Sequence, residues 1–111
     1  MESVPQVLRI FCLKTGEVPF SEWFLELRDS RAKQKIIARL TRLRAGNFGR
    51  TNSVGQGVRE LKIDYGPGYR VYYGIHGDEL ILILVAGSKR TQTADIKKAR
   101  TYWIEWKETN T

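Results

Sequence analysis

Three apolar stretches separated by two very short turns constrain the fold of this chain more than any other feature. The stretches span Val58–Ile63, Tyr69–Ile75 and Leu80–Ala86, and the turns are Gly66-Pro-Gly68 and His76-Gly-Asp78. Turns of this length bring consecutive strands together only in antiparallel order. The sequence therefore predicts an antiparallel meander over residues 58–86. Its last strand is apolar throughout, as expected of a central strand buried on both faces.

Side-chain alternation gives the first two of these strands two unlike faces. In a strand, neighbouring residues point to opposite sides of the sheet. Glu60 and Lys62 therefore share one face of the first strand. Arg70 and Tyr72 share the corresponding face of the second strand. We expect a polar sheet face that carries these four side chains, backed by an apolar face that helices cover.

The chain before the meander predicts one strand, two helices and a loop. Residues Val7–Leu13 are rich in branched and aromatic side chains, which is typical of a buried or half-buried strand. Pro19 suits the first position of a short helix, and Asp29 or Ser30 can cap a second one. The loop covers residues 46–57, which hold four glycines and no periodicity. The apolar stripe expected on the second helix consists of Ala32, Ile36, Ile37, Leu40 and Leu43.

A third helix is expected after the meander. Thr91 or Thr93 can cap its start, and apolar residues then recur at helical spacing as far as Trp106. The order of strand, two helices, three strands and helix predicts an α+β fold with one mostly antiparallel sheet. A chain of 111 residues is long enough for one hydrophobic core. We therefore expect a single domain over residues 1–111.

Positive charge sets the kind of partner that this chain prefers. Its 19 Lys and Arg against 12 Asp and Glu give a net charge of +7, and this excess favours polyanionic partners. The second helix carries six of these cations and no acid over residues 30–44. A solvated helix face is the alternative interpretation of this pattern. The residues predicted to bind RNA are Lys33, Arg39, Arg42 and Tyr69, the last by stacking on bases.

The sequence offers no set of residues for metal or cofactor chemistry. His76 is the single histidine and Cys12 the single cysteine, and the acidic residues form no cluster at ligand spacing. We expect no metal and no cofactor, and a buried Cys12. The longest apolar run, Leu80–Ala86, is too short to cross a bilayer, and the residues after Met1 lack a secretion signal pattern. A soluble cytoplasmic protein without a membrane partner is therefore expected.

Cationic side chains are the main chemical resource of the predicted polar face. Lysine and arginine can hold a phosphate and stabilise the extra negative charge of a pentacovalent phosphorane. Such a site can cut RNA without a metal, because the 2′-hydroxyl of RNA is the nucleophile once a base removes its proton. The candidate catalytic residues are Lys62, Arg70, Tyr72, His76, Lys89 and Arg90.

The general base stays open at this level. The candidates are Glu60, His76, Tyr72 and a Lys62 deprotonated with the help of neighbouring cations. Arginine is excluded because it stays protonated at neutral pH. Cross-strand pairing of Arg70 and Lys62 with Glu60 is the alternative, and it would make these cations structural.

Three motifs in this order resemble the HigB-like addiction module killer proteins of the RelE/ParE superfamily. They are Gly55-Gln-Gly-Val-Arg-Glu-Leu-Lys-Ile63, Gly66-Pro-Gly-Tyr-Arg-Val-Tyr-Tyr73 and Ala86-Gly-Ser-Lys-Arg-Thr-Gln92 followed by Asp95-Ile96. The resemblance covers roughly residues 7–107 and implies the RelE-like microbial ribonuclease toxin fold. It also implies that Arg70 contacts the scissile phosphate and that Lys62 is the preceding strand lysine. Lys89 or Arg90 then matches the cation after the last strand.

The resemblance implies the toxin of a type II toxin–antitoxin system, an endoribonuclease that cleaves ribosome-bound messenger RNA without a metal and so inhibits translation. Its implied partners are the ribosome, the messenger RNA and a cognate antitoxin, a small helix-turn-helix DNA-binding protein. The chain departs from RelE at Ile96, where RelE carries a tyrosine important for activity. This departure leaves His76, Tyr72 and Asp95 as candidate substitutes.

Two other functions stay open from the sequence. A ParE-like inhibitor of DNA gyrase would share the fold but cut no RNA. A non-catalytic module would bind only an antitoxin or nucleic acid.

Overall fold

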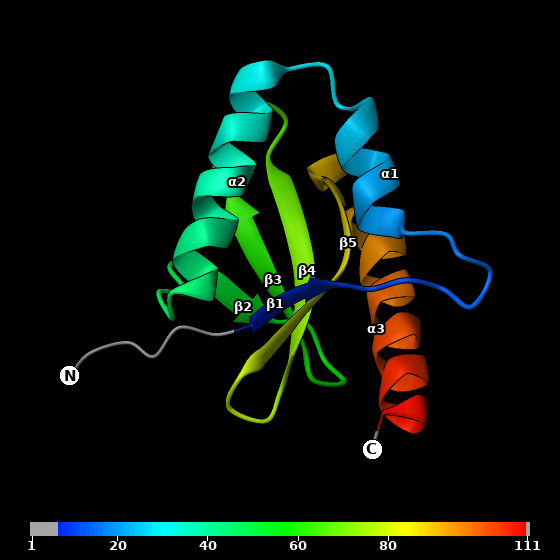
Figure 1. The fold of residues 1–111 in the computed structure, drawn as a ribbon. Helices are drawn as coiled ribbons and strands as arrows, with labels where there is room; N and C mark the ends of the chain where they lie inside the picture. The colour runs from blue at the N-terminus through cyan, green and yellow to red at the C-terminus, as the bar shows by residue number, and fades with distance from the viewer. Residues whose placement is uncertain (1–6, 111) are drawn as a thin grey trace.

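One mixed five-stranded sheet lies between two helices on one face and a third helix on the other (Figure 1). The computed structural model describes residues 7–110, so the predicted lack of a secretion signal at the first six residues lies outside it. The strand order is β1-β5-β4-β3-β2, with β1 Val7–Ile10, β2 Thr51–Ser53, β3 Val58–Ile63, β4 Tyr69–His76 and β5 Leu80–Ser88. The helices are α1 Pro19–Glu26, α2 Ser30–Arg44 and α3 Gln92–Thr109, and a 3₁₀ turn, Lys89–Thr91, precedes α3. The predicted α+β fold is confirmed.

The predicted antiparallel meander is present in the structure. β3 pairs with β4 and β4 pairs with β5, both in antiparallel order. Lys62 lies opposite Arg70, and Glu60 lies opposite Tyr72, so the polar residues of both strands share one face as alternation predicts. β5 has a neighbour on each side and is buried over residues 81–87, which confirms it as a central strand.

Two strands depart from the prediction. β1 pairs with β5 in parallel, and this contact joins distant parts of the chain that no local pattern links. β2 lies inside the predicted loop, where Thr51–Ser53 pair with Arg59–Leu61 of β3. Three polar residues carry no alternation to detect, and very short strands are a common protection for a sheet edge. The first strand ends at Ile10, and Cys12 beyond it is exposed, contrary to expectation.

The helix starts follow local chemistry. Pro19 lies in the first turn of α1, where its missing N–H is not needed. Asp29 caps α2, because its Oδ1 accepts hydrogen bonds from the backbone N–H groups of Arg31 and Ala32 at 3.0 and 3.2 Å. The residue before α3 is Thr91, which makes no side-chain capping bond. Its hydroxyl donates instead to Asp95 at 2.5 Å.

The sheet has a hydrophobic core on each face. On one face α1 and α2 pack against apolar residues of β3, β4 and β5. On the other face α3 packs Ala99 and Trp103 against the sheet. α3 therefore covers the face that was expected to be open and polar: Tyr72 is fully buried, and Glu60 and Arg70 are 3% and 7% exposed. The expectation was wrong because the apolar stripe of α3 must also be buried, and this sheet face was the one left free.

Candidate functional site

Three cationic residues lie around the turn that joins β3 and β4. Lys62 and Arg70 are direct cross-strand neighbours, so their Cβ atoms lie about 5 Å apart on one face. Arg70 Nη1 donates a hydrogen bond of 3.0 Å to the carbonyl oxygen of Gly68. The backbone N–H of Lys89 donates to the same oxygen at 2.9 Å. The Gly68 carbonyl thus ties the strand arginine to the turn after β5, and we call Lys62, Arg70 and Lys89 the cationic cluster.

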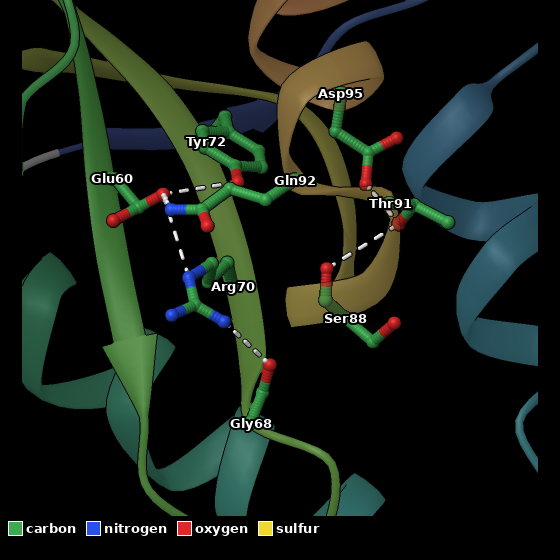
Figure 2. A network of polar contacts seen from close by, with 8 residues as sticks. All are labelled: Glu60, Gly68, Arg70, Tyr72, Ser88, Thr91, Gln92 and Asp95. Carbon is green, nitrogen blue, oxygen red and sulfur yellow. Dashed lines mark hydrogen bonds and ion pairs between the residues drawn. The ribbon is translucent and has the colours of Figure 1, made fainter.

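A buried carboxylate lies next to this cluster (Figure 2). Glu60 Oε2 accepts hydrogen bonds from Tyr72 Oη at 3.0 Å and from Gln92 Nε2 at 2.8 Å. Arg70 Nε lies 3.6 Å from the same oxygen, close enough for an ion pair but too far for a hydrogen bond. Within residues 7–110 this buried Nε has no hydrogen-bond partner. Glu60, Arg70, Tyr72 and Gln92 form what we call the buried network, which joins two strands to the start of α3.

Tyr72 is a proton donor in this network. Burial raises its pKa far above the ordinary value, and the negative charge of Glu60 and the hydrogen bond to it raise the pKa further. A phenol with such a pKa keeps its proton at neutral pH. Tyr72 therefore holds the Glu60 carboxylate in place, and the structure gives no support to Tyr72 as a general base.

The first turn of α3 rests directly on the backbone of β5. Asp95 is 6% exposed and accepts the 2.5 Å hydrogen bond from Thr91. A Cβ atom on Gly87 would lie 2.5 Å from Thr91 Oγ1 and would also collide with Asp95 Oδ2. Burial raises the pKa of Asp95, whereas the Thr91 hydrogen bond and Lys98 lower it. Glycine at this position lets α3 approach closely enough to bring Gln92 onto Glu60 (Figure 2).

His76 lies apart from the cationic cluster. It ends β4, six positions after Arg70, which places the two residues about 20 Å apart along the strand. The imidazole is exposed and meets the Trp106 ring edge-on, with ring centroids 5.1 Å apart. The structure therefore does not bring His76 together with the other candidate catalytic residues. Arg90 is exposed beside Lys89 in the 3₁₀ turn.

Arg39, one of the predicted RNA-binding residues, is occupied by the protein backbone. Its Nη1 donates a 2.7 Å hydrogen bond to the carbonyl oxygen of Lys62, and its Nη2 lies 3.5 Å from the carbonyl oxygens of Phe48 and Arg50. Desolvation, followed by repulsion from Arg42 and Arg50, lowers its pKa, although arginine stays charged. Arg39 fixes the strand that carries Lys62.

The other predicted RNA-binding residues have different surroundings. Arg42 is exposed on α2. The Lys33 ammonium lies 5.3 Å from the centre of the Phe24 ring, a cation–π contact at the surface of α1. Tyr69 is 8% exposed and meets the Trp23 ring edge-on at 5.8 Å, inside the core under α1 and α2. Its ring is therefore not presented to bases, contrary to expectation.

Gln92 is the site residue that sequence reasoning missed. It lies one position beyond a predicted helix start, where amide side chains are ordinary, and no periodicity marks it. The sequence offers both Thr91 and Thr93 as the cap of this helix, so it does not decide whether residue 92 precedes or begins the helix.

The described residues offer charge but no metal ligands. Within residues 7–110, no three His, Cys, Asp or Glu side chains gather in a group that could hold a metal ion. In the same range no helix is long and apolar enough to cross a membrane. The cationic cluster can bind an oxyanion by charge and hydrogen bonding, and the buried carboxylate beside it can accept a proton.

These features define a small basic α+β protein with a cluster of cationic residues next to a buried carboxylate. Residues 22–103 match the family described as phage-derived protein Gp49-like (DUF891), and this match covers most of the chain. The chain therefore belongs to the Gp49-like family, a family of addiction-module, toxin-like proteins. Membership implies a cognate antitoxin as partner.

A relative from Haemophilus influenzae is 48% identical to the chain over 81 residues, which cover 73% of this chain and 82% of the relative. That relative is named only as an uncharacterized protein. No solved structure matches the chain.

Proposed function

We propose that this protein is the toxin of a type II toxin–antitoxin system and acts as a metal-independent endoribonuclease on ribosome-bound messenger RNA. The observation that supports this proposal is the cationic cluster beside Glu60. Lys62 and Arg70 are paired across two strands, and Lys89 is tied to Arg70 through Gly68. The toxin-like family supports the same direction.

In this proposal the cationic cluster holds the scissile phosphate. Arg70 is fixed by Gly68 through one terminal nitrogen, and Figure 2 shows its other terminal nitrogen pointing away from Gly68. That nitrogen and the ammonium groups of Lys62 and Lys89 donate to the phosphate oxygens. Their charges stabilise the phosphorane more than the ground state, because the phosphorane carries an additional negative charge.

Glu60 is the general base in this mechanism. Tyr72 keeps its proton, and His76 lies at the other end of β4. Figure 2 shows the second carboxylate oxygen of Glu60 pointing away from Tyr72 and Gln92, so it is not used by their hydrogen bonds. Glu60 is 3% exposed, so this mechanism requires bound RNA to displace the side chains that cover the carboxylate. Glu60 takes the proton of the RNA 2′-hydroxyl, the 2′-oxygen attacks the phosphorus, and the 5′-oxygen leaves with a proton from Lys62 or Lys89. DNA lacks this hydroxyl and is not cut.

The surface charge supports a ribosomal location for this chemistry. The net charge of +7 draws the protein to ribosomal RNA, and the exposed cations of α2, such as Arg42, are proposed to contact its phosphates. Cleavage of the messenger on the ribosome would then inhibit translation.

A second function is favoured by one observation. Glu60 and Arg70 are almost fully buried, as in a structural ion pair, and Gln92 covers Glu60. In this alternative the network holds α3 on the sheet, and the protein binds an antitoxin or nucleic acid without cutting RNA. Removing an exposed or half-exposed cation of the cluster distinguishes the two functions, because RNA cleavage is lost only if the cluster is catalytic.

The test is induction of the protein in growing bacteria, with new 5′ ends mapped across messenger RNA and ribosome footprints locating the cuts. Lys62→Ala and Lys89→Ala should abolish most cuts while the fold remains intact by circular dichroism. Lys14→Ala, which removes an exposed lysine before α1, is the matched control and should cut like the unchanged protein.

The outcomes separate the candidate functions. Cuts in ribosome-bound messages that need Lys62 support the proposal. Growth arrest with DNA damage and no cuts indicates inhibition of DNA gyrase. Absence of both arrest and cuts leaves the non-catalytic module.

A further inference from the structure

An apolar groove runs between α1 and α2, on the sheet face opposite the cationic cluster. Its volume is about 320 Å³, and β1 contributes Ile10 to its lining. Figure 1 shows β1 in the foreground, between the lower ends of α1 and α2 in this view. Ser21 is the one polar residue among those that line it. The apolar side chains of the groove are Ile10, Phe20, Phe24, Leu25, Ile37 and Leu40.

Large apolar side chains at the rims of this groove are exposed to solvent. Leu25 is 74% exposed, Ile37 53% and Ile10 41%. Ile37 belongs to the apolar stripe predicted for α2, yet it lies outside the core that the rest of the stripe joins. Large apolar side chains gathered in one exposed depression mark an interaction surface in a small protein of this kind.

The α2 bank of the groove is positively charged. On α2, Lys33 lies one turn before Ile37, and Arg44 lies one turn after Leu40. The Lys33 ammonium is held over the Phe24 ring at 5.3 Å, so its charge lies directly at the groove. α2 has no acidic residue, and the two acids of α1, Glu22 and Glu26, project from the side of that helix that does not line the groove.

We infer that the groove binds an amphipathic helix of the antitoxin, with an apolar face in the groove and acidic residues along the side over α2. A channel between two helices accepts the ridge of a third helix, whose apolar residues recur at i, i+3, i+4 and i+7. The cationic bank of α2 fixes which side of the bound helix carries the acidic residues. This inference rests on membership of a toxin-like family and not on RNA cleavage.

The groove and the cationic cluster lie on opposite faces of the sheet, which affects how the antitoxin can neutralise the protein. A helix in this groove leaves Lys62, Arg70 and Lys89 uncovered, because they lie across the sheet. The groove is therefore an anchor for the antitoxin, and any block of the cationic cluster comes from another part of the partner.

The test uses the full-length protein with labelled Ile and Leu methyl groups and two synthetic helical peptides. The peptides share one leucine pattern and carry either glutamate or lysine along one side. The glutamate peptide should shift the methyl signals of Ile10, Leu25 and Ile37. The lysine peptide should bind at least about tenfold more weakly at low salt, and added salt should narrow that difference.

Variants of the rim locate the site. Leu25→Gln with Ile37→Gln should weaken the glutamate peptide by about tenfold or more, because two apolar contacts are lost while helix propensity is kept. Ile104→Gln on α3 is the matched control, since Ile104 is 42% exposed and lies on the other side of the sheet, and it should change nothing. Lys33→Glu should reverse the preference between the two peptides.

Three results would overturn the inference: no binding of the glutamate peptide, binding that spares the groove methyls, or equal binding after the rim substitutions. Self-association that the rim substitutions abolish, measured by sedimentation, would show that a second copy fills the groove and would also overturn it. The Lys62→Ala protein should bind the glutamate peptide normally, so failure of the proposed cleavage and failure of this inference are distinguishable.

Discussion

The guanidinium of Arg39 in α2 holds the backbone carbonyl of Lys62 in β3 at 2.7 Å. The N–H of Lys62 is held too, because it donates to the carbonyl oxygen of Arg50 at 3.2 Å. β2 pairs with β3 only as far as Leu61. At Lys62 these contacts therefore take the place of a neighbouring strand and hold the end of β3. Arg39, which the sequence suggests as a nucleic-acid contact, therefore helps to hold Lys62 in position.

Arg39→Ala should destabilise the fold by about 1–3 kcal/mol, because a half-buried, charge-assisted hydrogen bond is lost. It should also lower RNA cleavage through displacement of Lys62. Arg42→Ala, one turn along the same helix and exposed, is the control and should stay within about 0.5 kcal/mol. Urea unfolding measures both variants, and equal stability of the two would contradict the role given to Arg39.

Gly87→Ala should destabilise the protein by about 1–3 kcal/mol, because its new methyl group would overlap Asp95 and Thr91. Adding Asp95→Ala should restore part of that loss, since it removes the closer of the two obstacles. A thermal-unfolding double-mutant cycle checks this coupling. Strictly additive effects would show that α3 does not rest on Gly87 in solution.

Glu60→Gln should destabilise the fold by about 2–4 kcal/mol, since it leaves the buried Arg70 guanidinium without a counter-charge while preserving side-chain volume. In the double variant with Arg70→Met the loss should be smaller than the sum of the two single losses. Denaturant titration of the four proteins provides the measurement. An unchanged stability of the single variant would mean that the pair carries no structural role.

The raised pKa of Tyr72 leads us to expect a steep fall in the free energy of unfolding at alkaline pH. Its pKa is raised in the folded protein, so above pH 10 the unfolded chain releases a proton that the folded protein keeps. The free energy of unfolding should therefore fall by about 1.4 kcal/mol for each pH unit above 10 from this residue alone. Tyr72→Phe should be less stable at pH 8, where it lacks the hydrogen bond to Glu60, yet should fall less steeply above pH 10. Parallel curves in urea unfolding from pH 8 to 11.5 would refute this account.

Several elements could be predicted because their causes are local. Pro19 and Asp29 act within one helical turn, and the short turns around Gly66 and Gly77 force consecutive strands into a meander. Alternation places Lys62 beside Arg70, because the period of a strand is two. The pairing that matters most for the candidate site was therefore available from the sequence.

The rest depended on contacts between distant parts of the chain. Local alternation was enough to assign which side chains share a face, whereas the element that covers this face is set by packing between distant segments. α3 covers it, so Glu60 and Arg70 become a buried pair and Gln92 joins them. Periodicity reports the direction of a side chain, whereas its burial depends on which other element packs against it.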